Sequence, residues 1–125
     1  MEIKPHSGKV KPLGPYSQIL EVGDFLFLSG QVALARDGNV ISGDTQTQAE
    51  KILENIYDLL ESAGSSLSRV IKTTIFLTDL KDFQGVNEVF RRNFKEPFPA
   101  RTTVQVSALP LGAKIEIEAI ALKGK

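Results

Sequence analysis

Residues 45–77 read TQTQAEKILENIYDLLESAGSSLSRVIKTTIFL, and this stretch decides the fold. Its opening from Thr45 to Gln48 has the spacing of a capping box, and Gly64 supplies a helix stop. The β-branched run from Val70 to Leu77 is typical of a strand. Because a crossover helix precedes it, we expect this strand to pair in parallel inside a sheet. Between the capping box at 45–48 and Gly64, apolar residues recur at three- and four-residue steps, which predicts a helix with one apolar face: Ala49, Ile52, Leu53, Ile56, Leu59, Leu60 and Ala63.

Two shorter strands are expected upstream of this helix. They run from about Tyr16 to Val22 and from Phe25 to Ser29, with Gly23-Asp24 between them as the turn of a hairpin. The second strand is apolar at consecutive positions from Phe25 to Leu28, so it is expected to be covered on both faces. A further turn at residues 36–39, with the sequence RDGN, leads to the helix.

Downstream, a second helix is expected from Asp82 as its N-cap to about Phe94, ended by Pro97 and Pro99. The strands 100–108 and 113–122 flank Leu109-Pro110-Leu111-Gly112, which predicts an antiparallel hairpin. The predicted order is ββαβαββ. The fold class is therefore α+β, a mixed sheet with two helices packed on one face. One apolar face of the second helix would contain Phe83, Val86, Phe90 and Phe94.

The composition narrows the classes of function. A length of 125 residues predicts one domain spanning 1–125. The absence of cysteine excludes disulfides, thiol catalysis and cysteine-ligated metals, and a single histidine, His6, leaves no histidine cluster for a metal. We expect His6 to be solvated. Acidic and basic residues number 15 each, so nucleic-acid binding is not favoured. The N-terminal segment has no apolar signal core, which predicts a cytoplasmic protein.

The last predicted hairpin has one polar face. If Gln105 lies opposite Glu116, then Arg101 shares a sheet face with Glu116. A solvated face crossed by salt bridges is one interpretation. The other is an interface between subunits, because two helices can cover only one side of the sheet. The polar face would hold Arg101, Thr103, Gln105, Glu116 and Glu118, and the apolar face Thr102, Val104, Val106, Ala108, Ile115, Ile117, Ala119 and Ala121.

Arg101 has the chemistry of a carboxylate anchor. It follows the rigid segment Phe98-Pro99-Ala100, and its planar guanidinium can make two parallel charge-assisted hydrogen bonds to a carboxylate. One arginine is a weak signal when taken alone.

Four motifs occur in a fixed order along the chain: GPYSQ at 14–18, SGQ at 29–31, FPART at 98–102 and KIEIEAIA at 114–121. On these motifs the chain resembles the Rid family of reactive-intermediate deaminases, also called the YjgF or L-PSP family. The resemblance implies a chorismate-mutase-like fold and a homotrimer with one active site in each cleft between subunits.

The resemblance also implies roles for individual residues. Arg101 would bind the substrate carboxylate and Glu116 would help to hold a water, which makes these two the expected catalytic residues. The family often has a cysteine two residues after the arginine, where this chain has Thr103, so a backbone contact carries over but a thiol role does not. The expected substrate-binding residues are Tyr16 (from the neighbouring subunit), Ser29, Gly30, Asn87 and Thr103.

The implied reaction is that of a 2-iminobutanoate/2-iminopropanoate deaminase. It hydrolyses reactive enamines and imines released by pyridoxal-phosphate-dependent dehydratases to 2-keto acids and ammonia, without a cofactor or metal. Such hydrolysis already proceeds in water, so orientation and one positioned acid or base suffice. Two alternatives stay open: a single-strand ribonuclease or translation inhibitor, and a protein that binds a keto acid without turnover.

Overall fold

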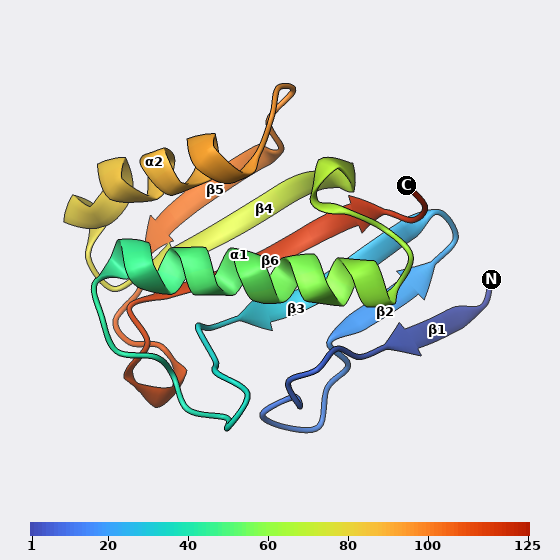
Figure 1. Cartoon of the computed structure of the whole chain (residues 1–125), viewed down its shortest axis with the longest axis horizontal. Coiled ribbons are helices and arrows are strands. Elements are labelled where there is room, and N and C mark those ends of the chain that lie inside the picture. The colour runs from blue at the N-terminus through green and yellow to red at the C-terminus, as the bar shows by residue number, and fades with distance from the viewer.

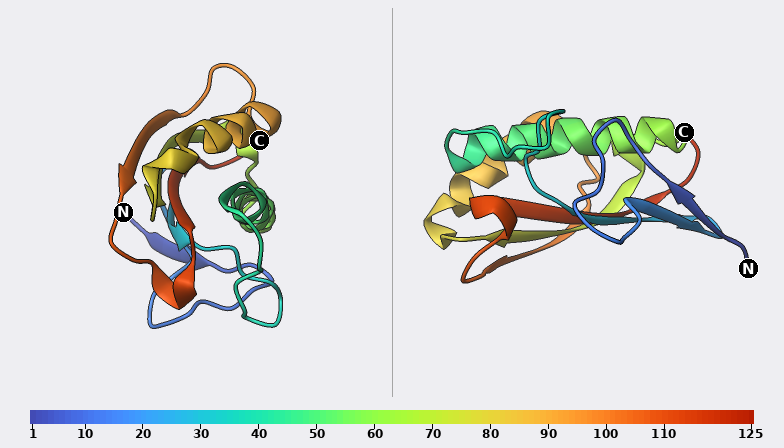
Figure 2. Two further views of the ribbon diagram at one scale, coloured as in Figure 1. Left: turned by 90° about the vertical axis from the view of Figure 1, so that its left-hand side faces the viewer. Right: turned by 90° about the horizontal axis from the view of Figure 1, so that it is seen from below.

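The computed structural model describes residues 1–125 and places two helices on one face of a six-stranded mixed sheet (Figure 1). Figure 2 shows the same two layers from the side, with the opposite face of the sheet carrying no helix. The predicted α+β class and one-sided helix packing are confirmed. The elements are β1 Ile3–His6, β2 Ile19–Val22, β3 Phe25–Gln31, α1 Thr45–Ser62, β4 Val70–Leu77, α2 Phe83–Asn93, β5 Ala100–Gln105 and β6 Ile115–Leu122, with short 3-10 turns at Leu67–Arg69, Leu80–Asp82 and Pro110–Gly112.

The strand order in the sheet is β1-β2-β3-β6-β4-β5. The predicted hairpin at Gly23-Asp24 is confirmed, since Val22 pairs with Phe25. Strand β4 lies inside the sheet, as expected, and pairs in parallel with β5. Its other neighbour is β6, which runs antiparallel to both β3 and β4. Neither helix is long and apolar enough to cross a membrane.

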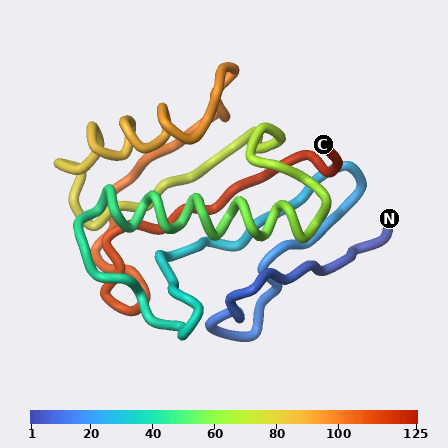
Figure 3. The backbone as a smooth tube through the Cα atoms, viewed as in Figure 1, coloured from blue at the N-terminus to red at the C-terminus, as the bar shows by residue number.

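The predicted hairpin of β5 with β6 is wrong, because β4 lies between these two strands. The segment that connects β5 to β6 crosses the end of β4 (Figure 3). There Val106 N donates to Leu77 O at 2.8 Å and Thr78 N donates to Lys114 O at 3.1 Å. The physical reason is burial. Strand β6 buries every second side chain under the helices and so belongs in the sheet centre, whereas β5 has no fully buried residue and suits an edge.

The N-terminal strand β1 is an element that the sequence pattern missed. It pairs antiparallel with β2 at the other edge of the sheet, and its residues are mostly exposed, so no apolar alternation marks it. The expectation that His6 is solvated is wrong, because its Nε2 lies 3.0 Å from Glu21 Oε1 in a partly buried pair. A strand this short gains its order from the neighbouring strand rather than from its own sequence.

Helix α1 buries its predicted stripe against the sheet and forms most of one wall of the main core. Its N-cap differs from the expectation. Asp44, not Thr45, caps the helix, with Asp44 Oδ1 accepting from Thr47 N at 2.8 Å. Thr45 is already helical and its hydroxyl donates to Asp82 Oδ2 at 2.7 Å, tying the start of α1 to the start of α2. Gly64 follows the helix with a φ of 76°, as its stop role requires.

The sheet face opposite the helices is uncovered within one chain and carries exposed apolar side chains. Along β3, Leu26 and Leu28 are buried under the helices, while Phe25 and Phe27 on the other face are 43% and 45% exposed. Val104 of β5 lies on this same face and is exposed too. The predicted need of β3 for cover on both sides is therefore met on one side only, and we call the other side the open face.

Candidate active site

Arg101 lies on the helix side of edge strand β5. It pairs with Thr73 of β4, and its side chain reaches toward α2. Its Nη2 donates to Asn87 Oδ1 at 2.6 Å, and its Nε donates to Thr103 Oγ1 at 2.9 Å. Partial burial lowers the pKa of Arg101, but an arginine pKa is so high that the guanidinium stays protonated at neutral pH.

Helix α2 presents three residues to this guanidinium. Phe83, Asn87 and Phe90 recur at steps of four and three along the helix, so they form one stripe. The guanidinium carbon of Arg101 lies 5.1 Å from the centroids of both the Phe83 and Phe90 rings, within range of cation–π attraction. Arg101, Asn87, Thr103 and the two rings are called the arginine cluster below.

Glu116 lies on the open face of β6. Its neighbours Ile115 and Ile117 are fully buried under the helices, so alternation turns Glu116 the other way. Burial raises the pKa of the Glu116 carboxyl above its ordinary value, and the nearby charge of Glu118 raises it further. A carboxyl with a raised pKa is a stronger base, which suits proton transfer.

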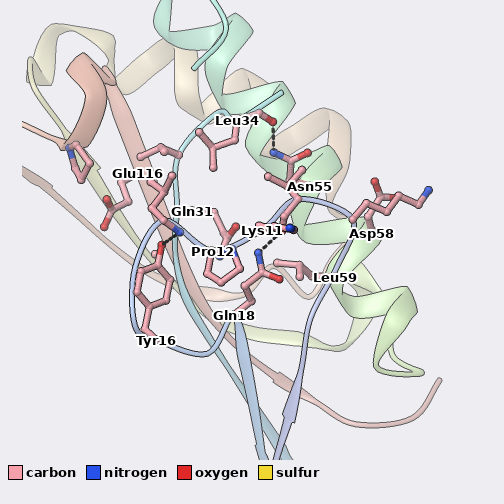
Figure 4. Close-up of a pocket in the computed structure, with 16 residues that line it drawn as sticks. Lys11, Pro12, Tyr16, Gln18, Gln31, Leu34, Asn55, Asp58, Leu59 and Glu116 are labelled. Atoms are coloured by element: carbon pink, nitrogen blue, oxygen red, sulfur yellow. Dashed lines mark hydrogen bonds between the residues drawn. The ribbon is translucent and has the colours of Figure 1, made fainter. Parts of the chain in front are cut away.

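A pocket brings Glu116 together with Tyr16 and Gly30 (Figure 4). These three residues are called the glutamate cluster. A Cβ at Gly30 would lie 2.9 Å from Cδ of Glu116, so glycine leaves room for the carboxylate where it lies and a larger residue would displace it. The Tyr16 hydroxyl accepts from Leu13 N at 3.1 Å, which fixes the ring beside the pocket.

The pocket is closed on its other sides by the segment of residues 9–13, by α1 and by Pro110. Its free volume is about 70 Å³, well below the roughly 300–1,000 Å³ of ordinary ligand pockets. Arg101 does not line it. A single chain thus holds the glutamate cluster in a small pocket that is lined by Lys9 and Lys11 but not by Arg101.

Ser29 directly precedes Gly30 and is hydrogen-bonded to the segment that follows Tyr16. Its Oγ donates to Ser17 O at 2.6 Å, and its N donates to Gln18 O at 3.0 Å. These bonds tie the end of β3 to the residues that follow Tyr16. Within the chain Ser29 therefore holds the Tyr16 segment in place.

The prediction that Arg101 and Glu116 share a sheet face is wrong. On β4, Thr73 pairs with Arg101, whereas Phe76 pairs with Glu116, and residues at odd and even positions of a strand face opposite ways. Arg101 and Thr103 thus face α2, and Thr102 and Val104 face the open side, the reverse of the expected assignment. On β6 the expected apolar set of Ile115, Ile117, Ala119 and Ala121 is buried under the helices.

The aromatic neighbours of Arg101 were not expected at the site. Phe83 and Phe90 were assigned to the apolar face of the second helix, which is where they lie. The signal that could have found them is the position of Asn87 between them on the same stripe. The chain brings together no group of three His, Cys, Asp or Glu side chains that could hold a metal ion.

The sequence and the fold are similar to those of known proteins. The family model described as Endoribonuclease L-PSP matches residues 7–123. A RutC family protein of Pyrococcus horikoshii is 49% identical over 114 residues, covering 90% of each chain. A human protein named 2-iminobutanoate/2-iminopropanoate deaminase is 42% identical over 113 residues, covering 90% of this chain and 82% of the human one.

A solved structure shows the same fold. The crystal structure of RidA from the Antarctic bacterium Psychrobacter sp. PAMC 21119 superposes with a TM-score of 0.91 at 41% identity. The match covers 95% of this chain and 98% of that one.

Proposed function

The chain belongs to the Rid family, whose model is described as Endoribonuclease L-PSP, and on that premise we propose that it is a deaminase that hydrolyses 2-imino acids to 2-keto acids and ammonia. The substrates are the short imines 2-iminobutanoate and 2-iminopropanoate. Relatives named as deaminases support this activity, and others carry only the RutC family name.

One observation carries the proposal: Arg101 is a partly buried cation that takes part in none of the ion pairs of the chain. Its partners are the neutral oxygens of Asn87 and Thr103. A partly buried charge of this kind is stabilised when an anion pairs with it. The carboxylate of a 2-imino acid supplies that anion in the planar form that a guanidinium binds well.

Glu116 provides the acid and base chemistry. In the proposed reaction Glu116 takes a proton from water while the water oxygen forms a bond to the imine carbon. The C=N π electrons move to nitrogen, which takes the proton that Glu116 removed from water. The resulting carbinolamine then loses ammonia: its hydroxyl proton passes to the amine nitrogen, the C–N bond breaks and the C=O bond forms. The raised pKa of Glu116 supports this role, and a positioned acid or base contributes roughly 10²–10⁴-fold.

Because Arg101 and Glu116 face opposite sides of one sheet, we propose that each active site takes Arg101 from one subunit and Glu116 from another. The exposed aromatic side chains of the open face, with Phe25 and Phe27 about half exposed, support burial of this face against further copies. We propose a homotrimer with three such composite sites. In it Tyr16 and Gly30 accompany Glu116, and Asn87 and Thr103 accompany Arg101.

The description of the family model names an endoribonuclease, so RNA is the second candidate substrate. Equal numbers of acidic and basic residues give no net attraction to a phosphate backbone. No feature of either cluster favours RNA over a small carboxylate, and imine hydrolysis is therefore preferred.

The test couples the purified protein to a threonine dehydratase and follows the imine trapped by semicarbazide. Wild type should reduce the trapped imine, and Arg101→Ala should lose this effect. Arg91→Ala is the matched control, since Arg91 is an exposed arginine paired with Glu88 on the surface of α2. If wild type leaves the trapped imine unchanged, the deaminase proposal fails.

A further inference from the structure

The hydrogen bonds of Arg101 determine how it can meet a ligand. An arginine has five N–H groups, and a carboxylate can bind side-on to Nε and Nη2 or end-on to Nη1 and Nη2. In this chain the single N–H of Nε donates to Thr103 Oγ1, and one N–H of Nη2 donates to Asn87 Oδ1. Both N–H groups of Nη1 are left without a partner in the chain. The side-on edge is thus already occupied at Nε.

The rest of the arginine cluster limits movement of the guanidinium. Phe90 is buried and Phe83 is partly exposed, and both rings lie 5.1 Å from the guanidinium carbon. Asn87 comes from the same helix face between them. With two rings and two oxygen acceptors around it, the guanidinium has one well-defined orientation.

We propose that Thr103 is a positioning residue, which holds Nε of Arg101 and thereby restricts the substrate carboxylate to the Nη1 end of the guanidinium. This inference rests on the proposed function of Arg101 as carboxylate anchor. It assigns Thr103 a role in this chain that needs neither a thiol nor direct contact with the substrate. The hydroxyl at residue 103 acts only through the arginine.

The kinetic test compares Thr103→Val with Thr103→Ser. Valine keeps the branched shape in strand β5 but removes the acceptor, and serine keeps the acceptor. Loss of one hydrogen bond to a charged group should raise KM for 2-iminobutanoate about tenfold, with kcat nearly unchanged. Thr103→Ser should restore the wild-type KM. A Thr103→Val enzyme with wild-type KM, or a Thr103→Ser enzyme as impaired as the valine variant, would overturn the inference.

A second readout does not depend on activity. In ¹H–¹⁵N NMR spectra of the unliganded protein, the Nε–H of Arg101 should exchange slowly with water in wild type and Thr103→Ser, and fast in Thr103→Val. Fast exchange in wild type contradicts the positioning role. Slow exchange in a wild type that fails to hydrolyse imines would instead contradict the proposed function, because the guanidinium would be held by Thr103 without serving deamination.

Discussion

Gly30 packs against the carboxylate of Glu116 so closely that a Cβ at residue 30 would displace it. A Cβ at residue 30 would lie 2.9 Å from Cδ and 3.2 Å from Cγ of Glu116, and it would overlap with Oε2. A non-bonded contact of a Cβ below 3.0 Å is essentially never seen in proteins, so the Glu116 side chain would have to move. Gly30 therefore allows the Glu116 side chain to lie against the end of β3, beside Tyr16.

Gly30→Ala should lower kcat by displacing this carboxylate. Glu116→Gln should lower kcat by roughly 100-fold or more, in the range of a lost acid or base. If glycine acts through Glu116, adding Gly30→Ala to Glu116→Gln should cause no further loss. The measurement is a double-mutant cycle on kcat in the semicarbazide assay. Additive losses would show that Gly30 has an independent role.

The pH dependence of the reaction should reflect Glu116. As a base it must be deprotonated, and its pKa is raised by burial and by Glu118. The catalysed rate should fall with decreasing pH at a pH above the ordinary range of a glutamate. Glu118→Gln removes one of the two causes, so the acid limb should move to lower pH. Glu54→Gln, on the exposed surface of α1, should leave the limb in place, and an unchanged limb in Glu118→Gln would contradict this account.

The Asp44 cap should stabilise α1 in a pH-dependent manner. Hydrogen bonds from Thr47 lower the pKa of Asp44 in the folded chain. The stabilisation is therefore present above the unfolded-state pKa and is lost as pH falls through the folded-state pKa. Asp44→Ala should lower Tm by on the order of a few degrees at neutral pH and by less in acid. Asp44→Asn, which also caps, should show little of this pH dependence; equal losses at both pH values in Asp44→Ala would contradict the prediction.

The fold was largely predictable, but the neighbours of β5 and β6 in the sheet were not. The stripe in α1 and the β-branched run of β4 each reflect a local period, which a single segment reveals. The position of β6 between β3 and β4 depends on which strand gains most from burial in the sheet centre, and proximity in sequence favoured β5 instead. The error reversed the face assigned to Arg101.

The residues of the candidate site could be proposed from the sequence, but their arrangement could not. The order of the motifs singled out Arg101 and Glu116. The alternation of side chains put both on one sheet face only because β5 was expected to pair with β6, and that pairing is wrong. The contact of Gly30 with Glu116 joins strands β3 and β6, and neither sequence motif indicates that these two residues meet. The partly buried pair of His6 and Glu21 likewise depends on the pairing of β1 with β2, which no alternation of apolar residues in β1 predicts.

The open face should be a contact between subunits. Phe27→Asp places a charge among the exposed aromatic side chains of this face, and it should convert the assembly to monomers without losing the helical circular dichroism signal. Tyr57→Asp is the matched control, because Tyr57 on α1 is 47% exposed, close to the 45% of Phe27, but lies on the helix side. Light scattering measures the masses. A monomeric wild type, or a Phe27→Asp variant of unchanged mass, would contradict the proposal.

The most direct test of the composite site mixes two inactive variants. Arg101→Ala and Glu116→Gln are co-expressed in equal amounts, so that subunits assemble at random. A site that takes Arg101 from one copy and Glu116 from another is intact when the first copy is Glu116→Gln and the second is Arg101→Ala. Each of the two copies is the required variant with a probability of about one half, so about one quarter of the sites are intact and imine hydrolysis should be about one quarter of the wild-type rate. Activity no higher than that of either variant alone would contradict a site shared between subunits.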